Sequence, residues 1–279
     1  MERTFYKMHG IGNDYVYFDC LDESFPAPEK AAVKLSDRHF SVGGDGIVLI
    51  LPSKTADAKM RMFNADGSEG KMCGNAIRCV GKYLYEVRGV KKNVLNIETL
   101  AGVKTLTLHT EGEEVVSVTV DMGRAMLAPS AIPARFEGEK IVDAPLTVGG
   151  KSYRVTCVSM GNPHCVVFGG NPYEIRLERI GPQFENHPTF PERVNTEFVE
   201  VLQKNDLKMR VWERGSGETW ACGTGACAVA VAAVLNGYCD KDADIKVRLR
   251  GGELIIHYTD ERVLMTGPAQ FAFKGTVEL

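Results

Sequence analysis

The chain has 279 residues, of which 44% are hydrophobic and 25% charged, a composition typical of a soluble globular protein with one large domain or two ordinary ones. A net charge of −3 gives no electrostatic reason to expect nucleic acid or an anionic membrane as a partner. The longest apolar run, 226–235, is about half of a membrane span, and the N-terminus lacks the apolar region of a secretory signal. We therefore expect a cytoplasmic protein that binds neither nucleic acid nor membrane.

The first half of the chain is predicted to consist of short strands around two helices. A turn at 10–13 separates the first two strands, and glycine turns interrupt a strand meander at 94–120. The predicted strands are 4–10, 14–20, 46–52, 58–65 and the meander, and the predicted helices are 28–39 and about 74–87.

The second half repeats this order after a proline-bearing stretch at 128–145. Its first strand leads into the turn Gly161–His164, as the first strand of the chain leads into the turn at 10–13. The predicted strands are 151–161, 165–170, 194–203, 206–214 and several within 244–279, and the predicted helices are 172–187 and 226–235.

Two pairs of motifs share one sequence offset. Gly12-Asn13 precedes Gly161-Asn162 by 149 residues, and Cys73-Gly74 precedes Cys222-Gly223 by the same 149. Matching contexts in matching order predict an α/β (α+β) fold of two pseudo-symmetric halves. We expect each half to be a strongly curved, mostly antiparallel sheet around a central helix, with the active site in the cleft between the halves. The expected domains are 1–121, completed by the C-terminal strand 268–279, and 122–267.

Cys73 and Cys222 stand out among the eight cysteines because each ends a polar, glycine-rich loop and opens a helix. The unpaired N–H groups of a helix N-terminus favour a thiolate, so we expect a lowered thiol pKa, and they also bind carboxylates. Two such sites facing one another would put a thiol on each side of a bound carboxylate. One thiolate could then remove the α-proton while the other thiol delivers a proton to the opposite face. Such an inversion needs neither a metal nor a pyridoxal cofactor.

The two loops also allow simpler interpretations. The two cysteines could merely fill space at helix starts, as buried cysteines often do. The run Gly223–Ala228 matches a dinucleotide fingerprint in letters, but a polar loop precedes it where that motif requires a strand. No C-x-x-C pair signals zinc or a thioredoxin-like site, and the histidines show no metal spacing. We expect no metal site and no cofactor.

Five motifs together resemble the diaminopimelate epimerase family and occur in that family's order. They are KMHGIGNDYV (7–16), NADGSEGKMCGNAIRC (64–79), VSMGNPHCV (158–166), FPERVN (190–195) and ERGSGETWACGTGACA (213–228). The resemblance implies cofactor-independent interconversion of LL- and meso-diaminopimelate, in the synthesis of lysine and peptidoglycan precursors. It also implies a homodimer whose only other partner is this small-molecule substrate.

The resemblance further assigns roles to individual residues. It makes Cys222 the proton acceptor and Cys73 the proton donor in the LL-to-meso direction. His164 and Glu213 would adjust the proton affinity of the thiols. The residues implied to contact substrate are Asn13, Asn64, Gly74, Asn75, Asn162, Asn195, Glu213, Arg214, Gly223 and Thr224. Arg214 would pair with the distal carboxylate. Gly46 departs from the glutamine of some family members, so a side-chain contact to substrate is either lost there or supplied elsewhere.

Two other functions remain open at this stage. A racemase for another amino acid, such as proline or hydroxyproline, would use the same thiols, but it would leave Arg214 and four asparagines without substrate partners. A thiol redox or binding protein would use the two cysteines as a reversible disulfide.

Overall fold

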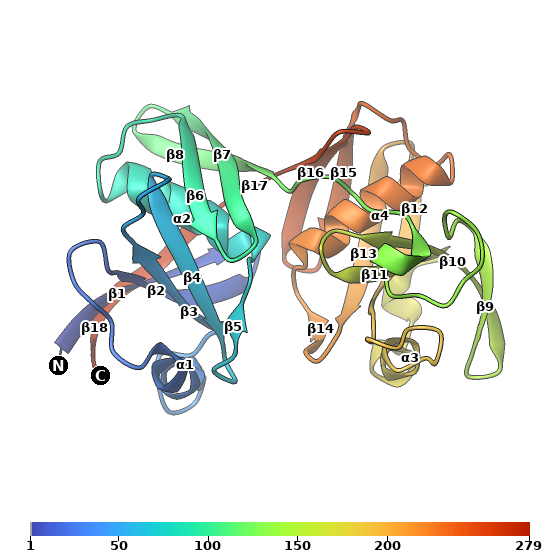
Figure 1. Cartoon of the computed structure of the whole chain (residues 1–279), viewed down its shortest axis with the longest axis horizontal. Helices are drawn as coiled ribbons and strands as arrows, with labels where there is room; N and C mark the ends of the chain where they lie inside the picture. Colours follow the sequence, from blue (N-terminus) through green and yellow to red (C-terminus); the bar gives the residue numbers. More distant parts are fainter. Residues whose placement is uncertain (1) are drawn as a thin grey trace. The chain divides into compact units, whose positions relative to one another are not determined.

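The computed structural model describes residues 2–279 (Figure 1). The chain divides into two compact units, the first made of Met1–Asp121 with Thr266–Leu279 and the second of Met122–Met265. No helix among residues 2–279 is long and apolar enough to cross a membrane.

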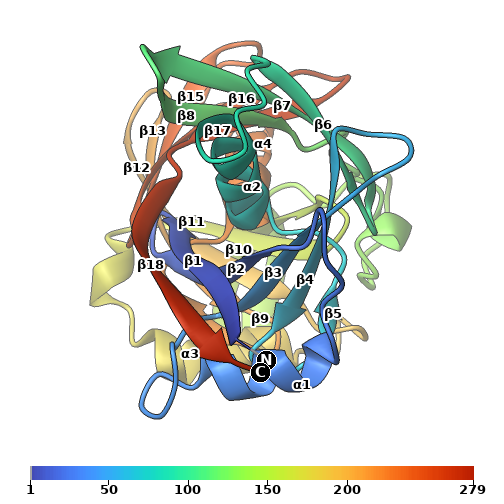
Figure 2. The ribbon, with the colours of Figure 1, turned by 90° about the vertical axis from the view of Figure 1, so that its left-hand side faces the viewer.

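The first unit is a curved sheet with two helices. Strands β2 and β3 pair in parallel, as do β4 and β6, and the other pairs recorded in this unit are antiparallel. The last strand runs along the first from Glu278 opposite Glu2, which brings the two ends of the chain together (Figure 2). The elements are β1 (Glu2–Gly10), β2 (Asn13–Asp19), α1 (Pro28–Ser36), β3 (Gly46–Leu51), β4 (Ala58–Asn64), β5 (Glu69–Gly70), α2 (Gly74–Glu86), β6 (Val94–Thr99), β7 (Gly102–Glu111), β8 (Glu114–Asp121) and β18 (Gln270–Glu278).

The second unit has the same plan. Strands β11 and β12 pair in parallel, as do β13 and β15, while its other recorded pairs are antiparallel. Its elements are the 3-10 turn η1 (Pro129–Ala131), β9 (Ala144–Val148), β10 (Lys151–Ser159), β11 (Pro163–Gly169), the 3-10 turn η2 (Pro172–Glu174), α3 (Leu177–Glu185), β12 (Asn195–Gln203), β13 (Asp206–Glu213), β14 (Gly217–Thr219), α4 (Gly223–Leu235), β15 (Asp244–Leu249), β16 (Gly252–Tyr258) and β17 (Val263–Gly267), the last of which runs across the boundary into the first unit.

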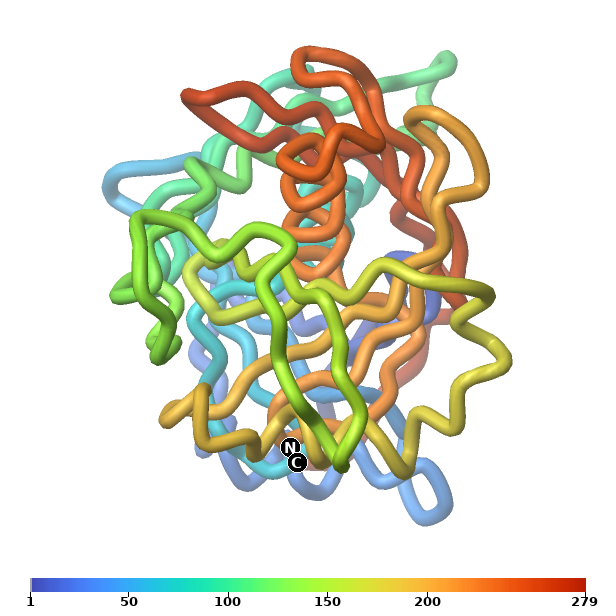
Figure 3. The backbone as a smooth tube through the Cα atoms, turned by 90° about the vertical axis from the view of Figure 1, so that its right-hand side faces the viewer, coloured from blue at the N-terminus to red at the C-terminus, as the bar shows by residue number. Residues whose placement is uncertain are grey.

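Each sheet wraps around one buried helix. Helix α2 packs against β1, β2, β7 and β8, and helix α4 packs against β10, β11, β12, β15 and β16 (Figures 1 and 3). The α4 sequence, GTGACAVAVAAVL, is apolar on every side, which is the pattern of a helix that is buried all round. Its small side chains leave room for strands on several sides of the helix.

Strand registers repeat with the offset read from the sequence. Tyr15 lies opposite Gly46 in the first unit, and His164, 149 residues later, lies opposite Asn195 in the second. Helices α2 and α4 have 13 residues each, beginning at Gly74 and Gly223. The predicted fold class, two similar halves that each have a curved, mostly antiparallel sheet around a helix, is therefore confirmed within each unit.

Some predicted elements differ from the structure for local reasons. The helix predicted at 28–39 ends at Ser36, because Asp37 is extended and its carboxylate accepts from the N–H groups of His39 and Phe40. The helix predicted at 172–187 is a 3-10 turn and a separate helix, divided by the extended residue Ile175. Strand β9 begins at the end of the proline-bearing stretch and continues to Val148, where no strand was predicted.

Candidate active site

Both loop cysteines are the N-cap residues of the central helices. Cys73 has extended backbone geometry, and its sulfur accepts from the N–H of Ala76 at 3.5 Å. Cys222 is extended too, and its sulfur accepts from the N–H of Gly225 at 3.3 Å. The prediction that each cysteine opens a helix is confirmed, and each sulfur contacts one of the N–H donors that a helix N-terminus leaves unpaired.

Amide groups surround Cys73 in the first unit. The Cys73 thiol donates to Asn13 Oδ1 at 3.3 Å, and Asn75 Nδ2 donates to the same oxygen at 3.4 Å. Asn13 Nδ2 donates to Asp45 Oδ2 at 2.7 Å, which fixes the orientation of that amide. Asn64, at the end of β4, donates instead to Ser68 Oγ at 3.0 Å. Three of the predicted residues are therefore gathered at this helix start.

A chain of polar contacts surrounds Cys222 in the second unit. The Cys222 sulfur lies 3.5 Å from Thr224 Oγ1, which accepts from Asn162 Nδ2 at 3.2 Å. Asn162 Oδ1 in turn lies 3.0 Å from His164 Nε2. The structure thus brings together four predicted residues from two segments of the sequence, since the turn between β10 and β11 meets the start of α4 here.

Asn195 and Arg214 lie beside this chain of contacts. Both ends of the Asn195 amide are engaged by backbone, because Nδ2 donates to the Pro163 carbonyl at 3.0 Å and Oδ1 accepts from the Arg214 N–H at 2.8 Å. Asn195 therefore fixes the backbone around Glu213 and Arg214. The Arg214 guanidinium donates to the Glu192 carbonyl at 2.8 Å on an exposed part of the unit.

Glu213 contributes a carboxylate whose charge is disfavoured. Burial raises its pKa, while hydrogen bonds from Thr219 and Cys222 oppose that increase. A carboxylate next to a thiol makes the loss of the thiol proton harder. Glu213 thus lies where it can influence Cys222.

Sequence reasoning missed Glu197. Its carboxylate is fully buried, with Oε1 2.7 Å from His164 Nδ1. An alternation of polar and apolar residues could not identify Glu197 as a buried residue of β12, because the five residues from Asn195 to Val199 are all buried. The available signal was an acidic residue directly before the apolar pair Phe198-Val199, since carboxylates are almost never fully buried without a partner.

The pKa of the Cys222 thiol is shifted in the direction opposite to the expected one. Burial raises it well above its ordinary value, and the negative charges of Glu213 and Glu197 raise it further. The hydrogen bonds from Thr224 and from the Gly225 N–H lower it, as the helix N-terminus predicts, but they do not outweigh burial and the two carboxylates. The expectation of a lowered pKa is therefore wrong for Cys222.

Gly46, where some family members have glutamine, has a structural reason in this chain. Its φ is 156°, and a Cβ placed on it would lie 2.0 Å from the Phe63 carbonyl oxygen. No side chain fits at this position unless strands β3 and β4 separate.

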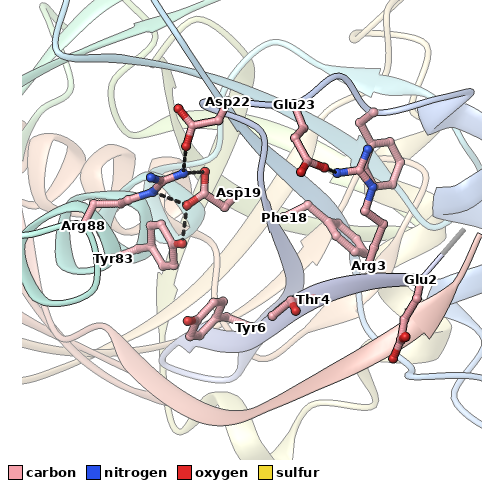
Figure 4. A pocket seen from close by; sticks show the side chains of 11 residues that line it. Glu2, Arg3, Thr4, Tyr6, Phe18, Asp19, Asp22, Glu23, Tyr83 and Arg88 are labelled. Atoms are coloured by element: carbon pink, nitrogen blue, oxygen red, sulfur yellow. Dashed lines mark hydrogen bonds and ion pairs between the residues drawn. The ribbon is translucent and has the colours of Figure 1, made fainter.

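A polar hollow of about 360 Å³ lies in the first unit, lined by residues other than the predicted site residues (Figure 4). Its charges are paired with one another, because Arg88 binds Asp19 and Asp22 and the Tyr83 hydroxyl donates to Asp19 at 2.5 Å. Among residues 2–279 no group of three or more His, Cys, Asp or Glu side chains is arranged to hold a metal ion.

Solved structures define the class of fold. A PhzF-family phenazine biosynthesis protein of Enterococcus faecalis superposes with a TM-score of 0.72 at 14% identity, covering 100% of both chains. A hydroxyproline epimerase of Agrobacterium vitis superposes with a TM-score of 0.68 at 16% identity, covering 99% of this chain and 92% of that one. The chain thus has the fold shared by PhzF proteins and by this amino-acid epimerase.

Sequence comparison gives the particular family within that class. The family model for diaminopimelate epimerase matches residues 5–128 and 156–272. The diaminopimelate epimerase of Acetivibrio thermocellus is 54% identical, over 99% of this chain and 98% of that protein. That of Methanococcus maripaludis is 51% identical over 99% of both. The chain belongs to the diaminopimelate epimerase family, as the five motifs predicted.

Proposed function

We propose that the chain interconverts LL- and meso-2,6-diaminopimelate through two cysteine acid/base groups and without a cofactor. The observation that carries this proposal is the pair of cysteines, Cys73 and Cys222, at equivalent N-caps of two helices related by the 149-residue repeat. Family membership supplies the substrate.

In the LL-to-meso direction the Cys222 thiolate removes the α-proton, and the electron pair of the C–H bond delocalises into the adjacent carboxylate. The Cys73 thiol then delivers its proton to the opposite face of the same carbon. The N–H groups of Gly74, Asn75, Gly223 and Thr224 would hold that carboxylate, because helix N-termini are ready-made anion sites. Turnover leaves Cys222 protonated and Cys73 ionised, which is the state that the reverse reaction needs.

The surroundings of Cys222 support its role as the proton acceptor. Burial and two nearby carboxylates raise the pKa of this thiol, so its thiolate is a stronger base than an ordinary one. The α-proton of an amino acid is only weakly acidic, and a stronger base lowers the barrier to its removal. Glu213 acts on the thiol directly, and His164 acts through Asn162 and Thr224.

The remaining polar residues would recognise the rest of the substrate. Asn13, Asn64 and Asn162 would bind its polar groups, and Asn195 would fix the backbone that contacts the distal amine. The Arg214 guanidinium would pair with the distal carboxylate. A proline-type substrate has no such distal group, which is why we place it second.

The first test is proton NMR in D2O with LL-diaminopimelate, L-proline and L-hydroxyproline offered separately. We expect loss of the α-proton signal and appearance of the meso isomer with diaminopimelate alone. Exchange with a proline would retain the two-thiol chemistry and reject the substrate. Exchange with none of the three would favour a redox or binding protein.

Variants test the assignment of the residues. Cys73→Ala and Cys222→Ala should abolish epimerisation, while Cys79→Ala and Cys227→Ala, both buried within the same helices, serve as matched controls. Arg214→Ala should raise KM strongly as well as lower kcat. Loss of activity in the control variants equal to that in the N-cap variants would reject our choice of cysteines.

We further propose that the enzyme acts in the cytoplasm and as a homodimer. Amino-acid biosynthesis supports the first statement, and the family resemblance supports the second. Sedimentation analysis of the purified chain tests the dimer, and a single monomeric species at micromolar concentration would reject it.

A further inference from the structure

A continuous chain of polar contacts joins a buried carboxylate to the reactive sulfur of the second unit. It runs from Glu197 Oε1 to His164 Nδ1 (2.7 Å), and from His164 Nε2 to Asn162 Oδ1 (3.0 Å). It continues from Asn162 Nδ2 to Thr224 Oγ1 (3.2 Å) and ends at the sulfur of Cys222, 3.5 Å from that hydroxyl. Glu197 and His164 are both fully buried, so solvent does not compete for the contact between them.

The polarity of the chain orients the Thr224 hydroxyl hydrogen toward the sulfur. Asn162 donates to the Thr224 oxygen, which leaves the Thr224 hydroxyl hydrogen available for another acceptor. The sulfur of Cys222 is the nearest such acceptor recorded for that hydroxyl. A hydroxyl that donates to sulfur favours the thiolate.

The first unit shows that the fold itself does not require a carboxylate here. Glu197 lies opposite Val166 in β11, and the equivalent residue 149 positions earlier, Val48, lies opposite Tyr17 in β2. Val48 is fully buried and apolar. The position of His164 is likewise taken by Tyr15. The same scaffold is therefore built around Cys73 without either ionisable group.

Gly225 is an independent observation that links Glu197 to the reactive sulfur, because both lie close to its Cα. A Cβ at Gly225 would lie 2.8 Å from Glu197 Oε1 and 3.1 Å from the sulfur of Cys222. The equivalent residue of the first unit is Ala76, which is fully buried, as is Val48. The first turn of α4 lacks a side chain where the carboxylate and the sulfur approach it.

We infer that Glu197 is a positioning residue for Cys222, acting through His164, Asn162 and Thr224 to orient the hydroxyl that contacts the sulfur and to set how basic the thiolate is. The inference rests on the proposed function, in which Cys222 removes the substrate proton. Unlike Glu213 and His164, Glu197 belongs to none of the five motifs that carry the family resemblance.

The charges around Glu197 define the expected sign of its effect. His164 and Cys165 face it from β11, Glu213 from β13, and Cys222 from α4. Its negative charge raises the pKa of Cys222, after burial and the charge of Glu213. Glu197→Gln keeps the shape and a hydrogen-bonding group for His164 but removes that charge. The Cys222 thiolate should then form at lower pH and be a weaker base.

The experiment compares the pH profiles of kcat/KM for LL-diaminopimelate in the wild type, Glu197→Gln and Glu200→Gln. Glu200 is on the same strand but is only partly buried and pairs with Lys208, so it is the matched control. In Glu197→Gln we expect the acidic limb to move to lower pH by about one unit. We also expect the plateau to fall about tenfold, because a less basic thiolate removes the proton more slowly. Glu200→Gln should reproduce the wild-type profile.

A direct titration separates this inference from the proposed function. The Cβ NMR shift of Cys222 reports its ionisation without substrate, and its signal is identified by its loss in Cys222→Ser. We expect that signal to titrate at lower pH in Glu197→Gln than in the wild type. A merely structural role would lower kcat/KM equally at every pH and leave the titration unchanged, which would overturn the inference. Absence of epimerase activity in the wild type would reject the proposed function, and the titration would still test the coupling.

Discussion

Replacing Gly225 by alanine tests how closely the first turn of α4 is fitted to Glu197 and Cys222. In a helix, Gly→Ala ordinarily stabilises by about 0.5–1 kcal/mol, because glycine loses more backbone entropy on folding. Here the new Cβ would lie 2.8 Å from Glu197 Oε1, whereas ordinary contacts begin at 3.4 Å. The buried carboxylate must therefore retreat by about 0.6 Å.

Such overpacking costs about 1–3 kcal/mol, which outweighs the gain in helix propensity. We expect Gly225→Ala to be less stable by about 1–2 kcal/mol. We also expect it to lose about ten- to a hundredfold in kcat/KM, since the sulfur is displaced along with the carboxylate. Denaturant unfolding and steady-state kinetics on the same preparation measure the two effects.

The first unit supplies the compensating substitution, because there the equivalent pair is Ala76 and Val48. The double variant Glu197→Val with Gly225→Ala should therefore regain stability relative to Gly225→Ala, while its activity stays low. We expect a coupling energy of about 1 kcal/mol or more in the double-mutant cycle. Ala76→Gly, the reverse change in α2, should cost only the helix propensity, about 0.5–1 kcal/mol. Additive effects, or a Gly225→Ala variant more stable than the wild type, would refute the steric reasoning.

Three further predictions concern the first unit. Gly46→Ala should destabilise by more than about 3 kcal/mol, because its Cβ would lie 2.0 Å from the Phe63 carbonyl oxygen; wild-type denaturant midpoints in this variant would contradict the argument. Asn13→Ala should have a larger effect on kcat than on the free energy of unfolding, since it removes the contact between Asn13 and the Cys73 thiol. Steady-state kinetics and thermal unfolding together check this prediction. An unchanged kcat would exclude the contact from catalysis. Arg88→Met should destabilise by about 1–3 kcal/mol at neutral pH, with the difference shrinking in acid. Burial raises the pKa of Asp19, but hydrogen bonds from Arg88 and Tyr83 outweigh burial and hold that pKa below its ordinary value. The stabilisation from these hydrogen bonds is therefore fully present above the ordinary pKa of an aspartate, and it is lost as the pH falls through the folded-state pKa of Asp19. Urea unfolding at neutral pH and at about pH 3 measures the difference in stability between Arg88→Met and the wild type. Arg61→Met, which breaks the surface pair with Glu69, is the control. A difference that grows in acid would refute the role given to Arg88.

The repeat could be predicted from sequence because turn residues and helix starts are local signals. Gly12-Asn13 and Cys73-Gly74 recur at one offset, and the structure extends that offset to the strand registers. The short strands β5 and β14 were missed, since two or three residues show no alternation. Helix α4 begins at Gly223, three residues before the apolar run that marked it in the sequence.

The site residues were predictable where a motif carried them, and Glu197 was not. Its partner His164 is 33 residues away in the sequence and lies on the neighbouring parallel strand, a contact that only the fold creates. The same limitation explains the wrong sign for the pKa of Cys222. Helix N–H groups are local and visible in the sequence, whereas burial and two carboxylates from other strands are not.

The two cysteines occupy one scaffold position in two different electrostatic surroundings. Each sulfur accepts an N–H from the first turn of its helix, so the helix terminus cannot distinguish them. The difference comes from the strands. Around Cys222 the equivalent positions carry His164, Glu197 and Glu213, whereas around Cys73 they carry Tyr15, Val48 and Asn64, none of which is charged at neutral pH. Because a two-base inversion needs one thiol and one thiolate at the start of each turnover, we argue that these strand-borne residues, rather than the helix dipole, make the electrostatic surroundings of the two cysteines unequal.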